Sequence, residues 1–283
     1  MSESNSGTLY LVATPIGNLE DITLRALRIL KEVDLIACED TRHSRKLLNH
    51  YGITTALTAY HQHNEEPKAE KLLEKLQDGK SIALISDAGT PGISDPGYRI
   101  VVACRNASLP VVAIPGPSAV ISALAISGLP TDAFVFAGFL PAKSTARREA
   151  LSRLRAEQRT TLFYEAPHRL GETLAEIVEE LGAERAVAVA RELTKMHEEL
   201  VRGRAEEVQR HFATREIKGE IVLLIGPATA AETPIVTVKE ALAQLLAEGM
   251  LLRAAVKQVA KAYGLPGDEV YKEALSLRAA AEE

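Results

Sequence analysis

The stretch IALISDAGTPGISDPG at residues 82–97 decides the fold of this 283-residue chain. An apolar run that favours β structure is followed at once by a loop rich in glycine and proline. Such a pattern predicts a short buried strand that ends in a tightly shaped loop. Because open α/β sheets bind ligands in the loops after the carboxyl ends of their strands, the stretch indicates both a sheet and a ligand site.

Similar runs lie on either side of this stretch, at 9–13, 33–37 and 111–114, and helical patterns separate them. This alternation predicts βα units around a mostly parallel sheet. Further apolar runs predict a second sheet, with strands at 134–137, 161–164, 186–189 and 221–225.

From residue 234 the chain is helical in pattern, with a turn at 264–268 before the last helix. Gly264 suits the end of one helix and Asp268 the N-cap of the next, as in a helix-turn-helix module. A helical pad packed on the second domain is the alternative. We therefore expect an α/β protein with three parts: α/β domains at 1–119 and 120–227, and a helical module at 234–283.

The composition is that of a soluble globular protein, with 46% hydrophobic and 25% charged residues. No apolar run reaches the roughly 18 residues of a membrane span, and residues 1–7 lack the features of a secretory signal. Cys38 and Cys104 lie in or beside apolar stretches, which predicts free thiols and a cytoplasmic location. The net charge of -5 argues against loose binding to nucleic acid, so any such contact requires local basic patches.

The loops at 14–21, 86–97 and 115–119 contain no lysine or arginine. Gly79-Lys80-Ser81 resembles the end of a phosphate-binding loop, but Glu74 replaces the glycine that such a loop needs. Glu39 and Asp40 keep a dinucleotide-binding dehydrogenase as an alternative, because a ribose-binding acid is expected there. Loops that offer polar backbone, serine, threonine and aspartate suit a ligand with an adenosine, a carboxylate and an amine but no phosphate, and S-adenosylmethionine has this character.

Six motifs then stand in order along the chain: TPIGNLEDIT (14–23), CEDTR (38–42), SDAGTPGISDPG (86–97), PGPSA (115–119), YEAPHR (164–169) and RELTK (191–195). Together they resemble the tetrapyrrole methylase superfamily, and within it the branch that methylates small-subunit ribosomal RNA. The resemblance covers residues 7–226 and the helical tail. Pro15 and Asn18 stand where the tetrapyrrole enzymes have more glycine, which favours the RNA branch.

The resemblance implies a homodimer that holds S-adenosylmethionine between the two domains of each subunit. It also implies methylation of a cytidine 2′-hydroxyl in 16S ribosomal RNA. The acidic net charge favours a shaped substrate, such as the assembled small ribosomal subunit, over free RNA, and no membrane partner is expected. The residues that the resemblance assigns to cofactor binding are Pro15, Asp87, Ala88, Gly89, Thr90, Ser118, Ala119, Glu165, Ala166, Arg191, Lys218, Gly219 and Glu220.

A ribose hydroxyl is a weak acid, so its methylation needs a base or a hydrogen-bonding site that excludes water. The candidate bases beside the first-domain loops are Glu39, Asp40, His61 and His63. We predict a catalytic group of Glu39, Asp40 and Arg42, in which Arg42 holds a phosphate next to the target sugar. His61 and His63 lack a third ligand nearby in the sequence, so no metal site is expected.

Two basic runs are candidates for RNA binding: Arg42, Arg45 and Lys46 in one, and Lys143, Arg147 and Arg148 in the other. Solvated helix faces would explain such runs equally well. Our hypothesis is that the second run begins in a loop that closes on RNA. Two other functions stay open at this point: methylation of a tetrapyrrole, and ribosome binding without catalysis.

Overall fold

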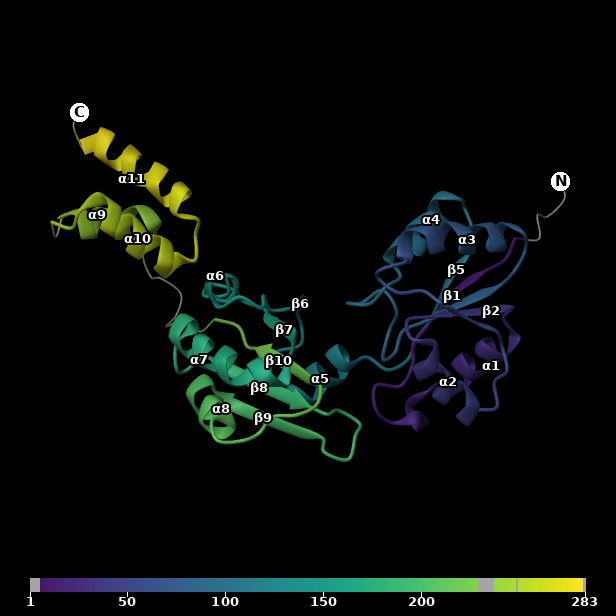
Figure 1. The fold of residues 1–283 in the computed structure, drawn as a ribbon. Coiled ribbons are helices and arrows are strands. Elements are labelled where there is room, and N and C mark those ends of the chain that lie inside the picture. The colour runs from purple at the N-terminus through teal and green to yellow at the C-terminus, as the bar shows by residue number, and fades with distance from the viewer. Residues whose placement is uncertain (1–5, 229–236, 248, 282–283) are drawn as a thin grey trace. The chain divides into compact units, whose positions relative to one another are not determined.

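The computed structural model describes residues 6–228, 237–247 and 249–281 (Figure 1). These residues form two compact units. The first runs to Ser122 and also includes Leu193–Met196, and the second contains the rest of the described chain. The division falls within helix α5 (Ala119–Ser127). None of the described helices is both long enough and apolar enough to cross a bilayer.

A five-stranded parallel sheet, in the order β3-β2-β4-β1-β5, is the centre of the first unit. Its strands are β1 (Leu9–Val12), β2 (Leu35–Cys38), β3 (Leu57–Ala59), β4 (Ile82–Ile85) and β5 (Val111–Ile114). The helices between them are η1 (Leu19–Asp21), α1 (Leu24–Glu32), α2 (Thr41–His50), α3 (Glu65–Gln77) and α4 (Tyr98–Asn106).

Both faces of this sheet are covered by helices, which explains why β4 is an unbroken apolar run. Ala83 and Ile85 pack in a cluster with α1 and α2, whereas Ile82 and Leu84 pack in a second cluster with α3 and α4. Successive side chains of a strand point to opposite faces, so a strand buried on both sides needs apolar residues throughout.

The strand order creates a switch point between β1 and β4. The two strands are neighbours, but the chain leaves β1 toward β2 and leaves β4 toward β5, on the other side. The connecting helices accordingly lie on opposite faces, α1 and α2 on one and α3 and α4 on the other (Figure 1). Loops that diverge in this way leave a crevice at the carboxyl ends of the strands, where open α/β sheets bind ligands.

The second unit contains a mixed sheet in the order β6-β7-β10-β8-β9, and β10 is antiparallel to both of its neighbours. Helices α6, α7 and α8 pack against one face through a single apolar cluster. The elements are β6 (Phe134–Phe139), α6 (Ser144–Ser152), β7 (Thr160–Glu165), η2 (Pro167–Arg169), α7 (Leu170–Leu181), β8 (Ala186–Arg191), β9 (Glu199–Arg204), α8 (Ala205–Phe212) and β10 (Ile221–Ile225).

Three C-terminal helices share an apolar core of their own: α9 (Val238–Ala247), α10 (Leu252–Tyr263) and α11 (Gly267–Ala281). Gly264 follows α10 in the left-handed conformation, with φ of 64°, as the sequence predicts. The expected N-cap role of Asp268 is wrong, because α11 already begins at Gly267 and Asp268 lies in its first turn.

The sequence pattern does not predict two edge strands, β3 and β9. Strand β3 has only three residues. Strand β9 has the sequence ELVRGR, which is rich in charge, and it pairs with a neighbour, β8, on one side only. Edge strands are often short or charged, because these features prevent pairing with other chains. Such strands therefore lack the apolar pattern by which a strand is found.

Candidate active site

The loops after β1 and β4 are joined directly at the switch point. The backbone amide of Thr14 donates to the carbonyl of Gly89 at 2.9 Å, and the amide of Gly89 donates back to Thr14 at 3.0 Å. The Thr14 hydroxyl also donates to the carbonyl of Ser86 at 3.1 Å. These bonds bring Pro15 and the 87–90 loop side by side, as expected of residues that share one ligand.

The loop after β5 completes this edge of the sheet. A Cβ added to Gly116 would lie 3.0 Å from Cβ of Ala13, which is tighter than most Cβ contacts, so glycine suits this close approach. The carbonyl of Pro117 lies 3.8 Å from the position that a Cβ on Gly89 would take. The structure therefore gathers the first-unit residues predicted to bind the cofactor, including Ser118 and Ala119, around the ends of β1, β4 and β5.

A cavity of about 50 Å³ opens beside these loops. Its lining comes from the ends of β1 and β4 and from α2, and includes Thr14, Pro15, His43, Ser44 and Asp87. The cavity therefore lies between these strand ends and helix α2.

Carboxylates gather at the same edge. The backbone amide of Asp40 donates to Oδ1 of Asp87 at 3.2 Å, which ties the loop after β2 to the loop after β4. Burial raises the pKa of the partly buried Glu39, and the charges of Asp95 and Asp87 raise it further. Burial also raises the pKa of Asp95, although a hydrogen bond from Ser86 opposes this. The crevice is therefore negative, and the pKa values of Glu39 and Asp95 are both raised in it.

Asp40 and Arg42, which we predicted to act with Glu39, have different surroundings. Asp40 is the N-cap of α2, where its Oδ1 accepts from the backbone amide of Arg42 at 2.7 Å, and this bond lowers its pKa. A capping carboxylate with a lowered pKa is a weak base. The Arg42 side chain is 92% exposed, and its Nε lies 3.6 Å from Asp40. Arg45 and Lys46 are also exposed on α2.

The two loop histidines, His61 and His63, lie near each other in the first unit. Their rings are 6.0 Å apart, and Nε2 of His61 lies 3.2 Å from the amide nitrogen of Asn64. Within the ranges that the structure describes, no group of three or more histidine, cysteine, aspartate or glutamate residues is placed to hold a metal ion. His61 and His63 thus belong to a polar loop.

In the second unit, the predicted cofactor residues lie at one end of three neighbouring strands of the mixed sheet, β7, β10 and β8. Ile221, at the start of β10, pairs with Glu165 on one side and with Arg191 on the other. Arg191 donates from Nε to Glu199 at 3.0 Å and from Nη1 to the carbonyl of Lys218 at 3.2 Å. The register therefore places Ala166, Lys218, Gly219 and Glu220 near these same strand ends.

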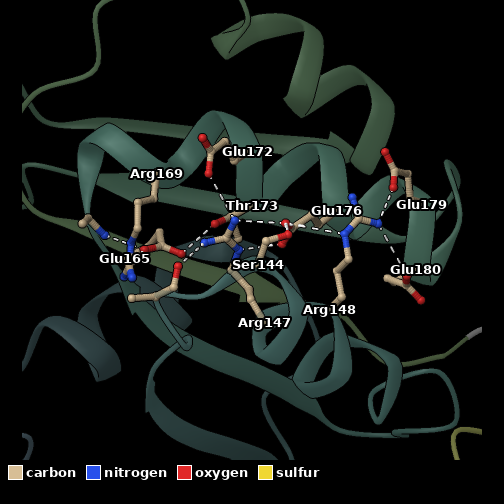
Figure 2. A network of polar contacts seen from close by, with 12 residues as sticks. Ser144, Arg147, Arg148, Glu165, Arg169, Glu172, Thr173, Glu176, Glu179 and Glu180 are labelled. Atoms are coloured by element: carbon tan, nitrogen blue, oxygen red, sulfur yellow. Dashed lines mark hydrogen bonds and ion pairs between the residues drawn. The ribbon is translucent and has the colours of Figure 1, made fainter.

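The side chain of Glu165 is fully engaged in the protein. Its Oε1 accepts from the amide of Ala166 and from Arg169, both at 2.7 Å, and its Oε2 accepts from Thr173 at 2.8 Å (Figure 2). The side chain is therefore buried and anchors η2 to α7. The predicted cofactor contact of Glu165 falls to its backbone and stays a prediction.

The second basic run is neutralised by α7. Arg147 is 1% exposed and binds Glu176 at 2.5 Å and Glu172 at 3.2 Å, while Arg148 pairs with Glu179 (Figure 2). The hypothesis that Arg147 contacts RNA is wrong, because a buried guanidinium cannot reach a phosphate. Arg147 and Arg148 lie on helix α6, whereas Lys143 lies in the loop just before it and is exposed. The run thus begins in a loop as expected, and closure of this loop on RNA stays a prediction.

The signal for this network was present in the sequence. Glu172, Glu176 and Glu180 recur every four residues, which places them along one side of α7. A helix with regular carboxylates next to one with regular arginines predicts ion pairs between the two, and we had considered only the arginines.

Residues 8–209 match the family model of the tetrapyrrole (corrin/porphyrin) methylases. Two curated relatives, both named ribosomal RNA small subunit methyltransferase I, match almost the whole chain. The protein from Synechocystis sp. is 49% identical over 276 residues, which cover 96% of this chain and 99% of the relative. The protein from Escherichia coli O157:H7 is 48% identical over 276 residues, which cover 97% of this chain and 96% of the relative.

Solved structures are similar in fold at much lower identity. The methyltransferase CobJ has a TM-score of 0.60 and 19% identity, and the match covers 79% of this chain and 95% of that one. Uroporphyrin-III C-methyltransferase from Thermus thermophilus, complexed with S-adenyl homocysteine, has a TM-score of 0.53 and 20% identity, covering 78% and 97%. These likenesses, with the two sheets and the C-terminal helices, confirm the predicted fold class.

Proposed function

Since this chain belongs to the tetrapyrrole (corrin/porphyrin) methylase family, and nearly half of its residues are identical to those of ribosomal RNA small subunit methyltransferases I, we propose that it methylates small-subunit ribosomal RNA. The methyl donor is S-adenosylmethionine. We further propose that the acceptor is the 2′-hydroxyl of a cytidine in 16S ribosomal RNA, within the small ribosomal subunit. The observation that carries the proposal is this near full-length identity, joined to a crevice at the switch point whose loops contain carboxylates but no lysine or arginine.

The residues at the switch point fit S-adenosylmethionine chemically. The donor has a sulfonium and an ammonium but no phosphate, and it supplies an activated methyl group when bound. The three loops offer backbone groups, Ser118 and Asp87 without any lysine or arginine, and Glu39 and Asp95 add negative charge nearby. Opposite charges stabilise a cation in such a site. We propose that the first-unit loops bind the donor and that Ala166, Arg191, Lys218, Gly219 and Glu220 bind it from the second unit.

We propose that Glu39 accepts the proton of the ribose hydroxyl. Its raised pKa makes it a stronger base than an ordinary glutamate, and it lies beside the loops assigned to the donor. Arg42 lies three residues later at the start of α2, and its exposed side chain holds a neighbouring phosphate in this proposal. The protein otherwise contributes alignment, since transfer from a sulfonium requires an in-line approach.

Methylation of a tetrapyrrole is the second candidate, and the solved structures with this fold favour it. Their identity to the chain is 19–20%, however, against 48–49% for the ribosomal RNA enzymes. Incubation with tritiated S-adenosylmethionine and either 16S RNA, 30S particles or uroporphyrinogen III would decide between the two. We expect label in the RNA, mapped to one ribose, whereas label only in the tetrapyrrole would refute the proposal, and no label in any acceptor would favour a non-enzymatic role.

Gly89→Ala is expected to weaken binding of S-adenosylmethionine about tenfold. Gly89 has φ of 79°, and alanine in the left-handed region costs about 1–2 kcal/mol, so the turn bonded to Thr14 would shift. The measurement is titration calorimetry. Gly52→Ala is the matched control, because Gly52 has φ of 62° with no atom within 4 Å of an added Cβ. Equal donor affinity in both variants would contradict the assignment.

We also propose that the protein is a homodimer that acts in the cytoplasm, where ribosomal subunits assemble. Tyr98 and Val102, one turn apart on α4, are 74% and 36% exposed. Apolar side chains on an exposed helix face favour an interface with another protein surface. Tyr98→Glu is expected to convert the dimer to a monomer in sedimentation velocity, and a wild-type monomer would refute this proposal.

A further inference from the structure

The middle helix of the C-terminal module, α10, has two different faces. Ala255, Val256 and Val259 are buried in the core that α10 shares with α9 and α11. The basic residues of α10 are Arg253, Lys257 and Lys261, and all three are exposed. The helix contains no acidic residue.

The spacing of these three residues places them in one row. At 3.6 residues per turn, each step of four residues turns the helix by one full turn and about 40° more, so the three side chains project from the same side. Eight residues at about 1.5 Å each extend the row over about 12 Å. A nucleic-acid strand presents more than one phosphate over such a length.

The row differs from the basic run on α6 in its partners. The arginines of α6 are paired with the carboxylates of α7, whereas no ion pair of Arg253, Lys257 or Lys261 occurs in the part of the chain that the structure describes. The chain as a whole is acidic, with a net charge of -5. This row of three cations, on a helix without an acidic residue, is therefore a local basic surface on an acidic protein. Unpaired cations on a rigid helix are suited to bind an anionic surface.

The third helix of the module is unsuited to reading bases. In DNA-binding helix-turn-helix proteins, the N-terminal residues of the last helix of the motif enter the major groove. Here the corresponding first turn of α11 carries Asp268 and Glu269, and Glu273 follows one turn later. These carboxylates would be repelled by phosphates on both sides of a groove.

We propose that α10 binds the phosphate backbone of ribosomal RNA through Arg253, Lys257 and Lys261. This inference rests on the proposed function, since it assigns a second RNA contact to the same enzyme. The contact is independent of base sequence, because phosphates position a protein on nucleic acid but do not specify a site. The module thus anchors the substrate, while the switch-point crevice carries out the reaction.

The test is the salt dependence of RNA binding by the full-length triple variant Arg253→Gln, Lys257→Gln and Lys261→Gln. Each phosphate contact adds about 0.7–0.9 to the slope of log affinity against log salt, so the slope should fall by about 2–3. The KM for 30S particles should rise at least tenfold, and kcat should be unchanged. Glutamine is a good helix former, so α10 should remain folded in the variant.

Two further variants make the result specific. Lys68→Gln, Lys71→Gln and Lys75→Gln removes the same charge from α3, where four glutamates accompany the lysines, and should leave the slope unchanged. Arg253→Lys keeps the charge and should retain the wild-type slope. A wild-type slope in the α10 triple variant would overturn the inference, as would weaker binding to 30S particles alone with unchanged binding to 16S RNA. Failure of wild-type protein to methylate RNA would instead refute the proposed function.

Discussion

Replacing Glu39 by glutamine is expected to lower kcat for RNA methylation by about 10²–10⁴-fold, with little change in affinity for S-adenosylmethionine. A positioned base contributes about this factor when the proton must leave in the transition state. Glutamine has nearly the same shape but cannot accept the proton. Single-turnover methyl transfer to 30S particles, combined with calorimetry for the donor, would measure the two effects separately.

The pH dependence of kcat provides a second readout of the same role. The base acts when ionised, so activity is lost as the pH falls through its pKa. Burial and the neighbouring carboxylates raise the pKa of Glu39, so the loss should begin at higher pH than for an ordinary glutamate near 4.3. This acidic limb should disappear in the glutamine variant, which a merely structural role for Glu39 does not predict.

Asp40→Asn is the matched control for this experiment. Asparagine is as good an N-cap as aspartate, so α2 should keep its start while one negative charge beside Glu39 is removed. Because that charge helps to raise the pKa of Glu39, the acidic limb should move to lower pH, and kcat on its plateau should be retained. Unchanged kcat in the Glu39 variant, or a large loss in the Asp40 variant, would reverse the assignment.

Arg147→Gln is expected to destabilise the second unit by about 3–5 kcal/mol, because removal of one partner leaves the buried Glu176 without its main counter-charge. Urea unfolding at neutral pH would measure this loss. Arg148→Gln is the control: Arg148 is 37% exposed, so solvent screens its ion pairs and its loss should cost much less than the loss of Arg147. A similar cost for both variants would contradict the role assigned to burial.

The same pair predicts a pH dependence of stability. Hydrogen bonds and charge from Arg147, with a bond from Ser144, outweigh burial and lower the pKa of Glu176. A carboxyl whose pKa is lower in the folded state contributes stability above its unfolded pKa, near 4.3, and this stability is lost as the pH falls through the lower folded value. Arg147→Gln should therefore show a weaker loss of stability in acid than the wild type.

Much of the protein could be predicted from the sequence by itself. Apolar runs that end in glycine and proline identified β1, β4 and β5, and the absence of lysine and arginine from their loops indicated a ligand without phosphates. Both properties are local, since a few consecutive residues determine a strand, a turn or the charge of a loop. The order of the six motifs was sufficient to recognise the family.

The tertiary structure decided what depends on distant residues. The position of β1 beside β4 creates the switch point, and no local pattern specifies which strands become neighbours. The basic run on α6 looked like an RNA-binding surface until α7, some 25 to 30 residues later in the chain, placed its glutamates against it. Glu39 and Asp40 are adjacent in sequence, yet burial raises one pKa and a helix N-terminus lowers the other. Charge and basicity depend on the surroundings of a side chain, and folding determines those surroundings.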